Sequence, residues 1–199
     1  MSDPEVLAPK ALMLVKTVPV DSVGPVSPVA PGVLRQAVSA SKGDIANEFF
    51  RAKQLEHAFT LVNQAMKGFL TTKQPPPSIC YKLKFDILFQ HGSMRGAWPG
   101  IARAIQIYPN YVDLHFYKGV FLMEHGLYAE AVKAFEYCFE IGDTQWEHFS
   151  EQGMGSFYAF HYLGRCMERM GKAHESLVYD YTASSIHASY FAQKREVVL

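Results

Sequence analysis

Two neighbouring stretches of this chain, 78–111 and 112–145, repeat one pattern of small and large residues with a step of 34 residues. Gly92 and Gly126 are separated by this step, and large apolar residues keep pace with them. A third stretch, 157–190, has the same internal spacing of glycines. Such a step marks a chain built from helix–turn–helix units that bury their apolar faces only against their neighbours.

A 34-residue helix–turn–helix repeat is typical of tetratricopeptide proteins. The sequence therefore predicts an all-α fold, a tetratricopeptide-like right-handed α-solenoid of three to four helix pairs. Gly119 and Ala131 are expected where the two helices of one pair approach most closely, since larger side chains would force them apart. Gly126 is expected to supply the left-handed residue of the turn.

The repeats do not follow one another without a break. An upstream pair is degenerate because it lacks the turn glycine, and Asp44 is the expected cap of its first helix. The residues after Ala188 are expected to form a short capping helix. The predicted repeats are 44–77, 78–111, 112–145 and 157–190, with an insertion at 146–156.

Residues 1–42 differ in composition from the rest, because prolines interrupt every helical period. We expect a Pro/Val-rich extended arm or linker, largely irregular, before a repeat domain at 43–199. An alternative is that the Leu12–Val20 stretch forms one strand or docks across the helices. The prolines of this segment are Pro4, Pro9, Pro19, Pro25, Pro28 and Pro31.

Charge and composition exclude several classes of function. Formal net charge is zero, so nothing favours nucleic acid or an anionic membrane as a partner. Cys80, Cys138 and Cys166 lack metal-ligand spacing, which predicts neither a metal nor a cofactor. No apolar run approaches the roughly 18 residues of a membrane span, and the N-terminus lacks the pattern of a signal peptide. We expect a cytoplasmic protein without a transmembrane segment.

Candidate catalytic groups are few. His161 and Cys166 lie five residues apart on one predicted helix, which turns them about 140° away from each other. Glu147, His148 and Glu151 form the one compact acid/base cluster, and no glycine-rich phosphate loop accompanies them. We therefore predict no catalytic residues and no enzyme, and expect the insertion to be an exposed loop that faces a partner.

The segments Asp113–Gly119, Tyr128–Ala131 and Gly153–Tyr158 carry a more specific resemblance. With the insertion between repeats, the region at roughly 45–190 resembles the helical repeat region attached to bacterial family 2 glycosyltransferases. In that family a nucleotide-sugar transferase domain with an Asp-x-Asp motif precedes the repeats. This chain has no Asp-x-Asp, and only the 1–42 arm precedes its repeats. The resemblance thus implies the scaffold without the activity.

The inner face of stacked helix pairs is lined by first-helix residues that point away from the second helix. In this chain that face combines apolar side chains with charges of both signs, which favours protein or peptide binding. Replacing Phe116 by Ala or Arg165 by Glu is expected to weaken binding with little change in melting temperature. The predicted partner-binding groove comprises Lys82, Asp86, Phe89, Asp113, Phe116, Val120, Met123, Tyr158, His161, Arg165 and Arg169.

The residues of this face do not fit one known type of tetratricopeptide groove. Tetratricopeptide domains that bind chaperone tails hold a terminal carboxylate with a Lys/Asn/Asn/Lys/Arg set. Lys82 matches the first position, but Asp86 and Tyr117 stand where asparagines are needed, and an aspartate repels a carboxylate.

The leading interpretation is a non-catalytic scaffold that binds a protein or peptide in its groove. The resemblance places it in bacterial glycosylation or cell-envelope assembly. The alternative is an accessory subunit or truncated relative of a family 2 glycosyltransferase that acts with a separate catalytic chain. A third interpretation is self-association through the C-terminal helix, with Phe191 and 197–199 as contacts.

Overall fold

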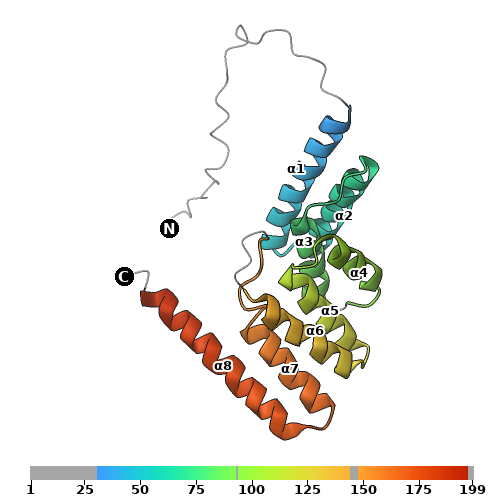
Figure 1. Ribbon diagram of the computed structural model, residues 1–199. Helices are drawn as coiled ribbons and strands as arrows, with labels where there is room; N and C mark the ends of the chain where they lie inside the picture. Colours follow the sequence, from blue (N-terminus) through green and yellow to red (C-terminus); the bar gives the residue numbers. More distant parts are fainter. Residues whose placement is uncertain (1–30, 93, 144–147, 197–199) are drawn as a thin grey trace, which may run out of the picture.

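A computed structural model describes residues 31–92, 94–143 and 148–196 of the chain (Figure 1). These residues form eight α-helices and no strand. None of these helices is both long and apolar enough to cross a bilayer. The helices are α1 (Pro31–Arg51), α2 (Leu55–Thr71), α3 (Ser78–Gln90), α4 (Trp98–Ile107), α5 (Val112–Glu124), α6 (Tyr128–Ile141), α7 (Phe157–Arg169) and α8 (Ala173–Glu196).

The helices stack as four pairs in chain order, from α1 and α2 at one end to α7 and α8 at the other (Figure 1). Each pair also packs on the next, because α2 contacts α3, α4 contacts α5 and α6 contacts α7. The first helices of the pairs touch one another as well, α1 with α3, α3 with α5 and α5 with α7. The prediction of an all-α, tetratricopeptide-like solenoid is confirmed, with four helix pairs.

The turn glycines have the backbone conformation that their spacing predicts. Gly92, Gly126 and Gly171 each follow the first helix of a pair, with φ of 75°, 75° and 77°. After α5, the Leu127 N–H donates to the Leu122 carbonyl over 2.9 Å, which closes the helix end. The first pair has no glycine in its turn, and Lys53 takes the left-handed conformation with φ of 58°.

The close approach predicted within the third pair is present. A Cβ atom at Gly119 would lie 2.5 Å from the ring of Phe135, which packs across from α6. Ala131 is completely buried near the start of α6. The two helices therefore meet through one small residue on each side, and the ring of Phe135 fills the space that Gly119 leaves free.

Two apolar cores stabilise the stack, and α3 contributes to both. The smaller core lies among α1, α2 and α3 and takes Leu83 and Ile87 from α3. The larger core runs from α3 to α7 and takes Tyr81 and Phe85 from α3. Successive faces of this one helix thus join the first pair to the other three.

Two predictions about the start of the helical region are wrong. Helix α1 begins at Pro31, so 31–42 is helical although an irregular arm was predicted to residue 42. Proline costs little at the first position of a helix, which explains why the helix begins there. Asp44 consequently lies inside α1 and does not cap it. Residues 1–30, and with them Leu12–Val20, lie outside the described residues, and the division into an arm and a domain stays a prediction.

The chain's last helix also differs from expectation. Helix α8 runs for 24 residues from Ala173 to Glu196 without a break, where a separate capping helix was predicted after Ala188. Its outer side leaves Leu177 70% and Tyr181 77% exposed. Residues 197–199, which the prediction of self-association used, lie outside the described residues.

Candidate functional site

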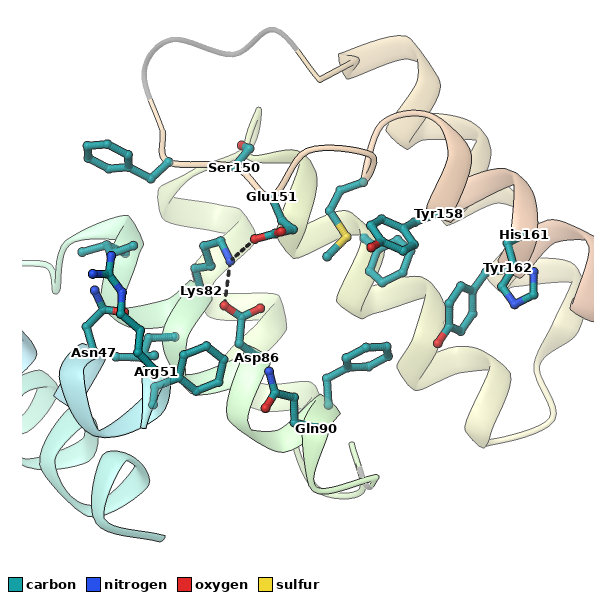
Figure 2. A pocket seen from close by; sticks show the side chains of 17 residues that line it. Asn47, Arg51, Lys82, Asp86, Gln90, Ser150, Glu151, Tyr158, His161 and Tyr162 are labelled. Carbon is teal, nitrogen blue, oxygen red and sulfur yellow. Dashed lines mark hydrogen bonds and ion pairs between the residues drawn. The ribbon is translucent and has the colours of Figure 1, made fainter. Parts of the chain in front are cut away.

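The first-helix face carries a groove with a volume of about 910 Å³ (Figure 2). Helices α1, α3, α5 and α7 form its floor and sides, and the loop 148–156 crosses it between α6 and α7. Figure 2 shows side chains from α1 and α7 on opposite sides, with those of α3 between them. The groove is therefore built from all four helix pairs.

Six of the eleven predicted groove residues line this cavity, and five do not. Asp113 is buried just beneath the floor, and Val120 is buried in the larger core. Met123 is half-buried against the same core, while Arg165 and Arg169 are exposed outside the lining. The six that line the groove are Lys82, Asp86, Phe89, Phe116, Tyr158 and His161.

The groove also contains residues that the periodicity of the repeats does not reveal. They come from two places, the second half of α1 and the loop 148–156. The loop had one sequence signal, the acid/base cluster that includes Glu151, for which the sequence predicted an exposed loop that faces a partner. The additional lining residues include Asn47, Phe50 and Arg51 from α1, and Phe149, Ser150, Glu151 and Met154 from the loop.

One lysine on the groove floor faces three carboxylates. The ammonium of Lys82 lies 2.6 Å from Asp86 Oδ2, one helical turn further along α3. It also lies 3.6 Å from Asp113 Oδ2 and 3.6 Å from Glu151 Oε2, which come from α5 and the loop. The hydroxyl of Tyr117 donates to the other oxygen of Asp86. The cluster therefore has more negative than positive formal charge.

Burial and this imbalance shift the pKa values of the cluster. Burial lowers the pKa of Lys82, but the charges of Asp86, Asp113 and Glu151 outweigh it, so the pKa lies above its usual value. Burial raises the pKa of Asp113 to about 7, although Lys82 and the N–H of Glu151 oppose the rise. Burial and Asp86 raise the pKa of the Tyr117 hydroxyl, which stays protonated as a donor.

Because folding raises the pKa of Asp113, the free energy of unfolding should fall as pH rises from 3.8 to about 7. The folded chain keeps this proton up to about pH 7, whereas the unfolded chain releases it near pH 3.8. The stabilisation is thus complete below that lower value and is lost as pH rises through 7. Between pH 6 and pH 8 the free energy of unfolding should fall by about 1 kcal/mol from this group. Urea denaturation of wild type and Asp113→Asn checks this, and an equal fall in the variant would contradict it.

The backbone of the loop 148–156 is held by side chains from the start of α5 and the residue before it. The Glu151 N–H donates to both oxygens of Asp113, over 3.2 and 3.1 Å. The Tyr111 hydroxyl donates to the Phe149 carbonyl over 2.7 Å. The ring of Phe149 itself is 82% exposed. The expectation of an exposed loop is thus correct for this side chain and wrong for the backbone, which lies against the groove.

Aromatic rings form the side of the groove next to α7. The ring centroid of Phe116 lies 6.2 Å from that of Phe89 and 5.1 Å from that of Tyr162. Phe135 completes this cluster from α6, 5.6 Å from both Phe116 and Tyr162. Phe116 is only 1% exposed, so it supports the groove from within.

Of the candidate catalytic residues, Glu147 lies outside the described residues, and His161 and Cys166 have different surroundings. Cys166 is buried, and burial raises the pKa of its thiol to about 11, which keeps it protonated near neutral pH. His161 is exposed at the groove, with its Nδ1 atom 3.4 Å from Asp180 of α8. Among the residues that the structure describes, no three His, Cys, Asp or Glu side chains group as metal ligands would.

No protein-family model matches the chain, and no curated protein matches it. Among the solved structures that share its fold are two of MamA. The crystal structure of MamA aligns with a TM-score of 0.58 and 16% identity, over 77% of this chain and 81% of that one. A second structure, "MamA AMB-1 C2221", aligns with a TM-score of 0.53 and 14% identity, over 77% and 85%. Both are all-helical and tetratricopeptide-like, and neither supports an association with glycosyltransferases.

Proposed function

We propose that this chain is a non-catalytic scaffold that binds a protein or peptide in the groove of its first helices. One observation carries the proposal, namely the large groove built from every helix pair, with aromatic rings beside a charged floor. Aromatic residues and a few fixed polar groups are typical of binding surfaces. The shared solenoid fold agrees with this function because solenoids present extended concave faces.

The groove fits a segment of polypeptide better than a small metabolite. It extends across the stack and receives residues from α1 at one end and from α7 at the other. Tyr158 is 41% exposed there, which leaves a ring free for contact. We therefore assign the binding surface to the lining residues of α1, α3 and α7, which the buried ring of Phe116 supports from beneath.

The biological setting stays a prediction that rests on the resemblance alone. A role in bacterial glycosylation or cell-envelope assembly, or as an accessory subunit of a separate glycosyltransferase, implies a transferase gene beside this one. Co-purification of a transferase through the groove would favour that setting. Its absence among groove-dependent partners would count against it.

The proposal is tested by removing an exposed groove ring without disturbing the core. The variant Tyr158→Ala should capture its native partner about tenfold less well, because exposed aromatic residues supply much of the energy of an interface. Its melting temperature should stay close to that of wild type. The measurement is quantitative affinity purification from native cells.

Tyr181→Ala is the matched control, since Tyr181 is an exposed ring on α8 that does not line the groove. It should retain the same partners as wild type. Partners that are lost equally with both variants, or retained with both, would show that the groove is not the binding surface.

A further inference from the structure

The loop 148–156 occupies part of the groove much as a bound peptide would. Three groups within three consecutive residues are recognised, namely the Phe149 carbonyl, the Glu151 N–H and the Glu151 carboxylate. Their partners are Tyr111, Asp113 and Lys82, which belong to the solenoid itself. The phenol of Tyr111 thus binds a backbone acceptor, and the carboxylate of Asp113 binds a backbone donor. The ammonium of Lys82 binds an acidic side chain.

We infer that the loop is an internal ligand, and that the groove binds in its place an extended acidic peptide from a partner. This inference rests on the proposed function and names its ligand class. The recognised pattern is an acidic residue whose carboxylate pairs with Lys82 and whose backbone N–H donates to Asp113. The carbonyl two residues earlier accepts a hydrogen bond from Tyr111. The recognition is for an internal acidic residue and not for the chain terminus that chaperone-tail domains bind.

The charges on the floor explain why the two ligands exchange and do not bind together. Lys82 already faces Asp86 and Asp113, and Glu151 is the third carboxylate around it. A fourth carboxylate would meet strong repulsion around a single ammonium. When the acidic residue of a partner takes the position of the Glu151 carboxylate, the number of carboxylates around Lys82 stays the same.

One of the three contacts that the loop must give up is the ion pair of Glu151 with Lys82, and its loop side chain is exposed. The Glu151 side chain is 58% exposed, whereas that of Lys82 is 11% exposed. An ion pair with one exposed member is weak, so the loop releases it at small cost. Because the loop is tethered, it still competes at high effective concentration and lowers the apparent affinity of a free peptide.

The test uses a fluorescent peptide with the sequence of residues 148–156 and blocked ends, titrated against the full chain. Wild type should bind it weakly, and Glu151→Ala should bind it about fivefold to tenfold more tightly, because Lys82 is then free of its internal carboxylate. Fluorescence anisotropy gives the two dissociation constants. Equal affinity for wild type and Glu151→Ala would overturn the inference.

Two controls separate recognition from non-specific binding. Tyr181→Ala changes an exposed ring of α8 that does not line the groove, and should bind as wild type does. A peptide with Gln in place of its Glu should bind the Glu151→Ala variant about tenfold less tightly. A peptide with Lys at that position binding more tightly than the acidic one would overturn the assignment of ligand charge.

The outcomes distinguish this inference from the proposed function. If partner capture depends on Tyr158 but the acidic peptide fails to bind, the ligand class is wrong and the scaffold function stands. If the peptide binds with the expected dependence on Glu151, the ligand class is supported whatever the native partner is.

Discussion

Replacement of Phe116 by Ala is expected to destabilise the chain by about 3–5 kcal/mol, because the side chain is 1% exposed and lies in the larger core. Its ring contacts Phe89, Phe135 and Tyr162, so the variant loses apolar burial and leaves a cavity among three aromatic rings. Urea denaturation followed by circular dichroism measures the loss. This result reverses the expectation, drawn from the sequence, that the change leaves the melting temperature almost unaltered.

Tyr158→Ala is the appropriate comparison, since this ring is 41% exposed and lies on the same side of the groove. We expect it to cost less than about 1 kcal/mol. Should Phe116→Ala cost no more than Tyr158→Ala, Phe116 would be a surface residue of the groove and its placement in the core would be wrong.

Replacement of Lys82 by Met should cost a similar amount, about 3–5 kcal/mol at pH 8, for an electrostatic reason. The side chains of Lys82, Asp86 and Asp113 are 11%, 15% and 0% exposed, so the variant leaves two carboxylates buried without a counter-ion. The volume of the side chain is nearly kept, so the loss reports on charge and not on packing. Denaturation with urea at pH 8 and at pH 6 provides the measurement.

The loss should shrink at pH 6, because Asp113 then carries a proton and needs no counter-ion. For the same reason, Asp113→Asn in the Lys82→Met background should restore part of the stability at pH 8. A loss that is independent of pH and unaffected by Asp113→Asn would mean that the cluster does not contribute through its charges.

The repeats were predictable because tight helix packing constrains residue size at fixed positions. Gly119 has to be small because Phe135 fills the space beside it, and such positions recur with each unit. Helix α5 accordingly begins at Val112 and α7 at Phe157, where the repeat predicts that they begin. Local patterns of this kind survive in a sequence without knowledge of distant contacts.

The first helix was harder to predict because its small residues resemble those of a linker. Ser39 and Gly43 lie inside α1 and weaken its helical pattern. Ser39 has a packing reason to be small, because it lies directly against Gly68 of α2. A Cβ atom added at Gly68 would lie 1.8 Å from the Ser39 hydroxyl. The two helices approach closely there, and that approach involves residues 29 positions apart.

Six of the seventeen residues that line the groove could be predicted, for a related reason. Helical periodicity identifies the side of α3 that carries Lys82 and Asp86. It does not identify the loop, because the contact of Glu151 with Asp113 spans 38 residues and depends on irregular backbone. Periodicity also does not tell a groove residue from one just beneath it, so Phe116 and Asp113 were both expected at the surface.

The division of the apolar interior into two cores has a consequence for how the groove changes shape. One side of the groove, with Phe50 and Arg51, belongs to the first pair, whereas its opposite side belongs to the larger core and its floor on α3 contributes to both cores. In a stack of repeats, a terminal pair opens more readily than the whole molecule unfolds. A ligand that touches both sides therefore adds its binding free energy to the opening free energy of α1 and α2. Slower amide hydrogen exchange in these two helices would record its presence, even where it touches neither backbone.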